Sequence, residues 1–279
     1  MILFLSVDTL RLWRYKREDM SVDIAYVRQV GIGAAFKGAR ALRAFFRGRF
    51  SVDKKGVRDL VTEADRASEK AIVDEIHYRF PDHAVLAEES GATGTRSEYR
   101  WIVDPLDGTT NFAHGLGLFC VSIAFAENGE VTAGVVLNPE TGELFTATVD
   151  HGAELNGAPI AVSGTSTLSD SLLATGFPYD VDKRLDPVMA RLSRCMAASR
   201  GIRRLGSAAL DLCYVACGRF DGFWEEGLYP WDTAAGMLIA RRAGATVTDF
   251  SGKAFVPEQK TILATNGLIH NEILKEMRE

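Results

Sequence analysis

The sequence has few of the features that mark specialised classes of protein. It contains four cysteines in 279 residues and no Cys-x-x-Cys pair, which argues against a zinc site or a disulfide framework. We therefore expect free thiols and a cytoplasmic protein. The longest apolar run at the start, residues 2–7, is interrupted by Ser6, is far too short to span a bilayer and is not followed by a signal-peptide cleavage site. There is no internal repeat and no low-complexity linker.

Positive charge is scarce relative to negative charge. Lys and Arg total 32 against 37 Asp and Glu, which gives a formal net charge of −5. Such a chain has no overall attraction for nucleic acid or for an anionic membrane, and we predict neither as a partner. The hydrophobic share of 47% and the charged share of 25% are those of an ordinary globular protein, which excludes a disordered or fibrous chain.

The spacing of apolar residues predicts a mixed α and β fold. Helical spacing covers residues 22–47, where three glycines weaken the pattern, and residues 63–80. Short strands follow at 84–87 and 101–103, separated by a loop over 90–98 that we expect to be mobile. An antiparallel meander is expected over 119–126, 131–137 and 143–149. Later strands are expected at 171–175, 220–224, 245–248 and 262–264, and later helices at 187–198, 208–217, 231–243 and 268–277.

These elements predict one compact body with two lobes and a cleft between them. The N-terminal lobe, residues 20–165, reads as helices over an antiparallel sheet, and the C-terminal lobe, residues 166–279, as α/β-like. The sequence pattern of a folded segment is clearer from Met20 onward than over residues 1–19. We therefore expect residues 1–19 to be a poorly ordered extension from an upstream start codon, with 20–279 forming the folded body.

The most informative stretch is Trp101–Phe112, WIVDPLDGTTNF. An apolar strand delivers Asp104 at its end, and Pro105 then directs the chain out of the sheet. Asp107 can fold back toward Asp104, because Gly108 permits a tight turn. Two carboxylates held this close repel each other unless a cation lies between them, and oxygen ligands of this kind suit Mg²⁺ far better than zinc.

The residues after the second aspartate add an anion site. Gly108, Thr109 and Thr110 offer backbone N–H groups and hydroxyls at the expected start of a helix, so phosphate beside metal is the simplest joint interpretation. The structural alternative is an Asp-rich turn in which Asn111 or Thr109 caps the helix. Two aspartates around Pro-Leu, directly after an apolar strand, favour the functional interpretation.

A second phosphatase chemistry is excluded by spacing. Haloacid-dehalogenase-type phosphatases carry Asp-x-Asp-Gly-Thr after a strand, and their first aspartate is a covalent nucleophile. Here the pattern is Asp-x-x-Asp-Gly-Thr. The extra residue changes the direction of the second carboxylate, so we expect no covalent phosphoenzyme.

Two further acidic positions fit the same centre. Glu88 ends the strand over 84–87, and Asp232 opens the helix over 231–243. Alone, Glu88 is interpreted as a surface charge and Asp232 as a carboxylate stabilised by the helix dipole.

Together these residues resemble the inositol monophosphatase family of lithium-sensitive, magnesium-dependent sugar phosphatases, and most closely its bacterial branch. The resemblance covers the chain from about residue 22. Its ordered blocks are 59–65, 87–90, 101–112, 206–209 and 231–245. It implies the αβαβα layered sandwich of that family, two or three Mg²⁺ ions, lithium sensitivity and, commonly, a homodimer, for which the 118–162 meander is a plausible interface.

The resemblance also implies roles for individual residues. The first Mg²⁺ is surrounded by Glu88, Asp104, the Leu106 carbonyl and Thr109. The second is held by Asp104, Asp107 and Asp232, and Glu88 reaches a third, looser ion through water. The catalytic set is Asp65, Glu88 and Thr109, with Asp65 pairing with Thr109 to help deprotonate the attacking water.

The implied substrate contacts follow from the same family blocks. Gly108, Thr109 and Thr110 hold phosphate oxygens. Ser207, Ala208 and Glu225, together with Asp107, face the rest of the substrate. The sequence therefore predicts a Mg²⁺-dependent phosphomonoesterase acting on myo-inositol monophosphate or a similar small polyol phosphate.

Other functions stay open at this point. Within the same chemistry they are fructose-1,6-bisphosphatase, 3′-phosphoadenosine 5′-phosphate phosphatase and histidinol-phosphate phosphatase. In a different class lies a regulatory binding protein that keeps the phosphatase site.

Overall fold

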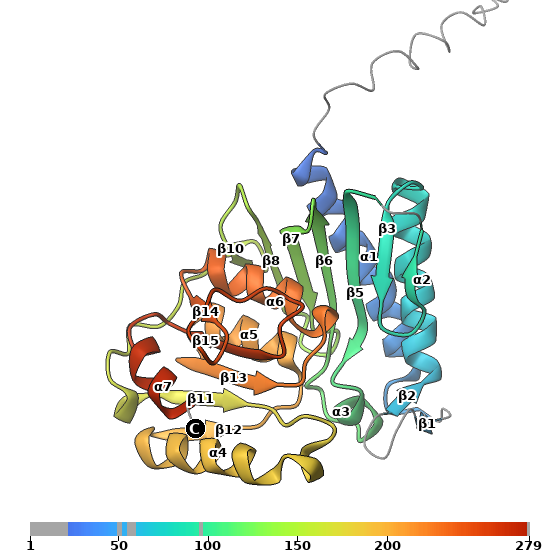
Figure 1. Ribbon diagram of the computed structural model, residues 1–279. Coiled ribbons are helices and arrows are strands. Elements are labelled where there is room, and N and C mark those ends of the chain that lie inside the picture. Colours follow the sequence, from blue (N-terminus) through green and yellow to red (C-terminus); the bar gives the residue numbers. More distant parts are fainter. Residues whose placement is uncertain (1–21, 49–51, 55–59, 95–96, 278–279) are drawn as a thin grey trace, which may run out of the picture.

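The computed structural model describes residues 22–48, 52–54, 60–94 and 97–277, and its helices and sheets alternate in five layers (Figure 1). Helices α1 (Ile24–Phe45) and α2 (Glu63–Arg79) cover one face of an eight-stranded sheet. Helices α5 (Ala208–Ala216) and α6 (Pro230–Arg242) lie between that sheet and a five-stranded one, whose other side carries α4 (Leu185–Ala198) and α7 (His270–Met277). The αβαβα order implied by the resemblance is confirmed. The expected extension over 1–19 lies outside the described residues.

The first sheet is built almost entirely from antiparallel pairs. Its order is β10-β9-β8-β7-β6-β5-β3-β4, and only β3 and β5 run parallel. The expected meander forms β6, β7 and β8, joined by tight turns. The strands are β3 (Ala84–Ala87), β4 (Gly91–Thr93), β5 (Tyr99–Asp107), β6 (Cys120–Glu127), β7 (Glu130–Leu137), β8 (Leu144–Thr148), β9 (Glu154–Leu155) and β10 (Ala158–Pro159).

The second sheet is mixed and has the order β12-β11-β13-β15-β14. Its strands β12, β11 and β13 are parallel neighbours, whereas β13, β15 and β14 pair antiparallel. The strands are β11 (Leu172–Thr175), β12 (Gly201–Arg203), β13 (Gly222–Glu226), β14 (Thr246–Thr248) and β15 (Thr261–Thr265). A separate antiparallel pair, β1 (Val52–Lys54) and β2 (Leu60–Thr62), precedes α2, and α3 (Thr109–Ala113) follows β5.

Three apolar clusters fill the spaces between the layers. One lies between α1, α2 and the first sheet and includes Trp101 and Phe125. Another surrounds α5 and α6 and reaches both sheets, and the third joins the second sheet to α4 and α7 around Trp224. No helix of the described residues is both long and apolar enough to cross a membrane.

Two local predictions were wrong, and short strands such as β12 were not predicted. The segment over 90–98 contains β4, which forms a hairpin with β3, where a loop was expected. Strand β5 does not end at Val103, because it continues through a register shift to Asp107, which pairs with Cys120. Strand β12 falls in a short basic run that carries no alternating pattern.

Candidate active site

The predicted site residues lie where several elements end or begin. Glu88 follows β3, and Asp104 and Asp107 lie at the end of β5, next to the start of α3 (Figure 1). Asp65 is in the first turn of α2, and Asp232 is in the first turn of α6. Segments far apart in sequence therefore supply neighbouring acidic side chains.

The end of β5 bulges around Pro105. The carboxylate of Asp104 is 1% exposed, and its Oδ1 accepts a hydrogen bond of 2.9 Å from the N–H of Leu106. The hydroxyl of Ser68 on α2 donates to the Pro105 carbonyl over 2.8 Å. Because the strand resumes its pairing at Asp107, the proline bends the chain within the sheet. Our expectation that Pro105 takes the chain out of the sheet was wrong.

Gly108 allows the sharp change from strand to helix. Its φ is +94°, and a Cβ there would lie 2.9 Å from the Leu118 carbonyl oxygen, so both backbone and space require glycine. Thr109 comes next, at the start of the five-residue helix α3. Its hydroxyl lies 3.1 Å from the Leu106 carbonyl and 3.3 Å from Oδ1 of Asp65. The pairing of Thr109 with Asp65 is therefore present.

Asp107 is turned toward the start of α5. Its Oδ2 accepts hydrogen bonds from the Ser207 hydroxyl at 2.6 Å and from the N–H of Ala209 at 2.8 Å. The Ser207 hydroxyl also caps α5 through the N–H of Leu210. Ser207 is thus held between the Asp107 carboxylate and its own helix, and Ala208 lies beside it in the same turn.

Asp232 sits at the third position of α6, where its Oδ2 accepts a 2.7 Å hydrogen bond from the N–H of Tyr229. Burial raises its pKa well above the usual range, and the charge of Asp107 raises it further. The pKa of Asp107 is also raised by burial, although its bonds to Ser207 and to α5 oppose the rise.

The pKa of Asp104 reports how closely the acidic groups converge. Burial raises this pKa well above its usual range. Three neighbouring carboxylates raise it further: those of Glu88, Asp107 and Asp232. Each of these groups was predicted to belong to one centre, and each acts electrostatically on Asp104.

The donor set suits a hard cation, since it consists of carboxylates, a backbone carbonyl and a hydroxyl. Among the described residues, however, no three His, Cys, Asp or Glu side chains are arranged so that they hold a single ion. Asp104, Asp107 and Asp232 each direct one oxygen toward a protein donor. The chemistry of the donors fits a divalent cation.

Glu225, at the end of β13, extends the site toward the second sheet. It is 9% exposed, and burial raises its pKa to about 8, with Arg204 opposing the rise. A Cβ on Gly176 would lie 2.1 Å from the Glu225 carboxyl carbon, so glycine leaves room for this group. The charge of Asp107 also acts on Glu225. Glu225 therefore lies beside the acidic centre.

Two residues of this region were not predicted. Glu69 is buried on α2 and accepts hydrogen bonds from the N–H groups of Glu89 and Ser90. Asn111 in α3 donates to the carbonyls of Leu118 and Leu205, at 2.7 and 2.8 Å. Glu69 lies four residues after Asp65, so helical spacing alone places both on one face of α2. No sequence pattern distinguishes Asn111 from an ordinary helix cap.

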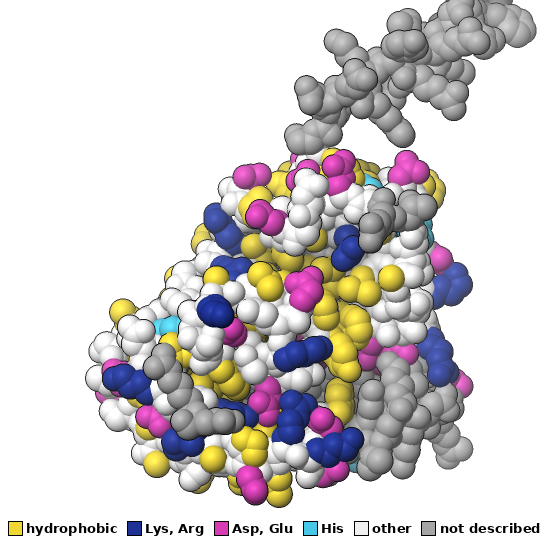
Figure 2. All heavy atoms as spheres, viewed as in Figure 1, with side chains coloured by type: hydrophobic (Ala, Val, Ile, Leu, Met, Phe, Trp, Pro, Cys, Tyr) yellow, Lys and Arg dark blue, Asp and Glu magenta, His cyan; other side chains and the backbone are white. Residues whose placement is uncertain are grey.

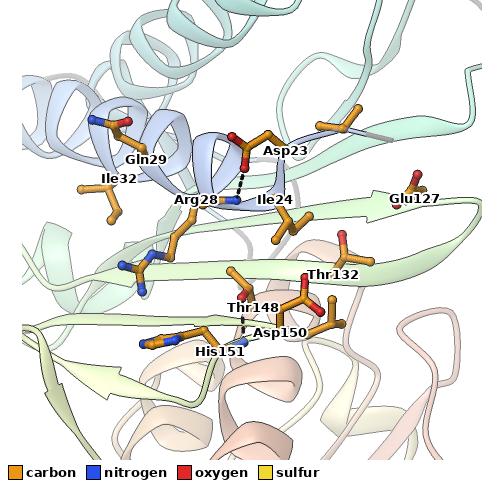
Figure 3. A pocket seen from close by; sticks show the side chains of 13 residues that line it. Asp23, Ile24, Arg28, Gln29, Ile32, Glu127, Thr132, Thr148, Asp150 and His151 are labelled. Atoms are coloured by element: carbon orange, nitrogen blue, oxygen red, sulfur yellow. Dashed lines mark hydrogen bonds between the residues drawn. The ribbon is translucent and has the colours of Figure 1, made fainter. Parts of the chain in front are cut away.

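A hollow of about 820 Å³ lies elsewhere, between the start of α1 and the ends of β6, β7 and β8 (Figure 3). Its polar groups serve the fold: Asp23 caps α1, and Arg28 pairs with Glu154. Thr148 accepts a hydrogen bond from the N–H of His151. This hollow offers no set of acidic and phosphate-binding groups like that around Asp104.

Basic and acidic side chains are interspersed on the face shown in Figure 2. Most basic groups lie in its lower half, and they do not merge into one patch.

Comparison with known proteins agrees with this geometry. A family model described as the inositol monophosphatase family matches residues 23–279. A protein named inositol-1-monophosphatase from Synechocystis is 50% identical over 224 residues, which are 80% of this chain and 78% of that protein. A protein named Nus factor SuhB from Pseudomonas aeruginosa is 45% identical over 221 residues, which are 77% of this chain and 82% of that protein.

The fold also has solved counterparts. The crystal structure of the extragenic suppressor protein suhB from Bartonella henselae matches with a TM-score of 0.87 and 42% sequence identity, covering 91% of this chain and 99% of that chain. The family match spans nearly all of the described residues, including every acidic group discussed above. The chain therefore belongs to the inositol monophosphatase family, a generally metal-dependent family of phosphatases, and is a phosphoric monoester hydrolase.

Proposed function

We propose that this chain hydrolyses the monophosphate ester of a small polyol, with myo-inositol monophosphate as the first candidate, and that it requires Mg²⁺. The observation that carries the proposal is the convergence of four acidic groups beside the Thr109–Asp65 hydrogen bond. Burial raises the pKa of Asp104, and the charges of Glu88, Asp107 and Asp232 raise it further. A relative named inositol-1-monophosphatase supports the choice of substrate.

This acidic centre would hold two ions and reach a third. The first would be held by Glu88, Asp104, the Leu106 carbonyl and Thr109, and the second by Asp104, Asp107 and Asp232. Glu88 would reach the third, looser ion through water. When bound, Mg²⁺ supplies a water of lowered pKa and neutralises charge on the ester oxygens.

The remaining residues hold and orient the reactants. Thr109 passes a proton from the attacking water toward Asp65, to which its hydroxyl lies 3.3 Å away. Gly108, Thr109 and Thr110 hold the phosphate oxygens. Four carboxylates and a phosphate of about two charges repel one another, so we expect cation and substrate to bind cooperatively.

The alcohol part of the substrate faces α5 and the second sheet. Ser207, Ala208 and Glu225 bind its hydroxyls, together with Asp107. Ser207 is already held by Asp107, and Glu225 by the space at Gly176, so these groups are preorganised.

The first test is replacement of one proposed metal ligand. Asp104→Asn keeps an oxygen that accepts from Leu106 and removes the charge. We expect Mg²⁺-dependent release of phosphate from inositol 1-phosphate to fall by at least about 100-fold, because a ligand and its charge are lost. Asp74→Asn, on the exposed side of α2, is the control and should behave like wild type. Unchanged turnover in Asp104→Asn contradicts the proposal.

A substrate panel then tests the polyol assignment. Phosphate release is compared for inositol 1-phosphate, fructose 1,6-bisphosphate, 3′-phosphoadenosine 5′-phosphate and histidinol phosphate. If kcat/KM for any of the last three is much higher than for inositol 1-phosphate, that compound becomes the assigned substrate.

We also propose that lithium inhibits the enzyme by replacing a weakly held Mg²⁺. We further propose a homodimer formed through the 118–162 meander.

A second role is favoured by one comparison, since a 45% identical relative is named Nus factor SuhB. A binding role of that kind need not depend on turnover. A partner captured from cell extract equally by wild type and by Asp104→Asn supports it, whereas a partner lost in that variant ties binding to the catalytic site.

Four free thiols support a reducing, cytoplasmic compartment.

A further inference from the structure

One turn of α2 reaches three different segments of the active site. Asp65 lies beside the Thr109 hydroxyl, and Ser68 donates to the Pro105 carbonyl. Glu69 binds the chain just after β3. Asp65 and Ser68 therefore act on the α3 side of the site, whereas Glu69 acts on the segment that carries Glu88.

Glu69 makes an unusually complete set of bonds for a buried acid. It is 6% exposed, and its Oε2 accepts the N–H of Glu89 at 2.8 Å. Its Oε1 accepts the N–H of Ser90 at 2.9 Å. A carboxylate has two acceptor oxygens in one plane, so each of the two successive N–H groups has an oxygen of its own.

These bonds fix the backbone on one side of Glu88, and a third bond fixes it on the other. The N–H of Glu88 itself donates to the Val103 carbonyl of β5 at 3.2 Å. Directly after Ser90 the chain reverses at Gly91, whose φ is +72°, and enters β4. Glu88 thus projects from a short segment that is anchored to β5 before it and to α2 after it.

We propose that Glu69 is a positioning residue that sets the affinity of the active site for its divalent cation by holding the segment of Glu88 in place. This inference rests on the proposed function, because it takes Glu88 to be a metal ligand. Glu69 touches neither cation nor substrate. It acts through the backbone of Glu89 and Ser90, as groups behind a metal ligand commonly do.

The same helix offers a matched control. Glu75 is 9% exposed on α2, and its carboxylate binds Lys37 and Arg79. Among the described residues, the hydrogen bonds of the Glu75 carboxylate go to Lys37 and Arg79 and leave the β3–β4 turn untouched. Glu69→Gln and Glu75→Gln therefore remove equivalent charges from buried positions of one helix, and only the first alters the support of Glu88.

The experiment measures binding of Mg²⁺ alone, by titration calorimetry on chelator-treated full-length protein. In Glu69→Gln the amide keeps one acceptor oxygen and turns an NH₂ group toward the second N–H. We expect a Kd for Mg²⁺ raised about 10- to 100-fold, against less than about threefold in Glu75→Gln. Amide exchange at Glu89 and Ser90 should accelerate only in Glu69→Gln. Excess Mg²⁺ should restore its kcat, which a general loss of folding would not allow.

The outcomes separate the two proposals. If wild type takes up no Mg²⁺, the proposed function fails. If wild type binds Mg²⁺ and Glu69→Gln binds it equally well, the positioning role is overturned. Should Glu69→Gln fail to fold, Glu69→Asp decides the matter, because it keeps the charge but is too short to reach both N–H groups. Wild-type affinity in Glu69→Asp then overturns the inference, and weakened affinity supports it.

Discussion

Thr109 has one hydroxyl proton and two acceptors for it. The Leu106 carbonyl lies 3.1 Å away and the Asp65 carboxylate 3.3 Å away, so the proton can move between them without movement of the backbone. Asp65 is 1% exposed, which keeps water from competing for this pairing. A proton taken up by Thr109 therefore has a ready path to a buried carboxylate.

Replacing Thr109 by alanine removes that path but leaves α3 and Gly108 in place. We expect kcat for inositol 1-phosphate to fall by about 100-fold, the usual scale of a lost general base, while KM changes by less. Steady-state kinetics at saturating Mg²⁺ measure the split. Thr141→Ala, in the exposed turn before β8, is the control. A change confined to KM means that Thr109 only binds.

Glu225 predicts a dependence of stability on pH. Burial raises its pKa from the ordinary value of 4.5 to about 8, so between these values the folded chain holds this proton while the unfolded chain has released it. Stability is therefore lost as pH rises from about 4.5 to about 8. In chelator-treated protein, Glu225→Gln should be more stable than wild type at pH 8, and the difference should vanish below pH 4. Urea unfolding at several pH values measures it.

Glu75 predicts a change of stability with pH that is opposite in sign to that of Glu225. Its pKa is lowered, chiefly by the bond from Lys37, so its contribution is present above the unfolded pKa and is lost on acidification. Glu75→Gln should then be less stable than wild type at pH 8 and equal to it in acid. Parallel pH profiles for Glu225→Gln and Glu75→Gln contradict the assigned environments.

At the scale of elements, the packing of α1 against α2 explains why glycines do not interrupt α1. The helix runs without interruption for 22 residues, although its glycines predicted a weaker pattern. At Gly38 a Cβ would lie 2.7 Å from Ile72 Cδ1 and 2.8 Å from Ser68 Oγ, both on α2. Close packing of α1 on α2 thus offsets the lower helix propensity of glycine.

Two substitutions in α1 separate propensity from packing. Gly33→Ala adds a Cβ with no atom within 4 Å, so it should stabilise the protein by about 0.5–1 kcal/mol. Gly38→Ala pushes α1 away from α2 and should lower the free energy of unfolding by about 1–3 kcal/mol. Chemical denaturation measures both values. If both variants are stabilised, the helices are not in contact at Gly38.

The sequence predicts helices with several apolar turns reliably and three-residue strands only in part, since β14 was expected whereas β4 and β12 were not. Helices α2, α4, α5 and α6 are found within a few residues of their expected limits. Strands β4 and β12 have three residues each and lie at sheet edges, where half of the pattern is missing. Strand β5 is longer than expected, because sheet pairing survives the bulge at Pro105.

The same distinction applies to the site. Glu88, Asp104, Asp107 and Asp232 end or open regular elements, so local sequence marks them. Glu69 lies in the middle of a helix, where an acid is ordinary, and only its contact with a distant turn distinguishes it. Tertiary contacts of this kind have no signature in one sequence.

At the scale of the whole molecule, the acidic centre joins segments 144 residues apart, Glu88 and Asp232 (232 − 88). A cation bound there links the first sheet to the layer of α6, so it should stabilise the entire fold. We expect Mg²⁺ at about 100 times its Kd to add about 2.7 kcal/mol to the free energy of unfolding. Differential scanning calorimetry with and without Mg²⁺ measures the rise in Tm. Asp104→Asn should abolish most of this rise, and an equal rise in that variant places the ion elsewhere.

The amide of Asn111 links the two halves of the chain by hydrogen bonds. One Nδ2 hydrogen is bound by the Leu118 carbonyl, on its own side, and the other by the Leu205 carbonyl, in the loop before α5. If that loop swings away, a buried donor loses its acceptor, which costs about 1–3 kcal/mol. The Asn111 amide therefore holds the loop before α5, and with it the Ser207 that follows, against α3, so the two halves of the chain keep a fixed spacing at the site.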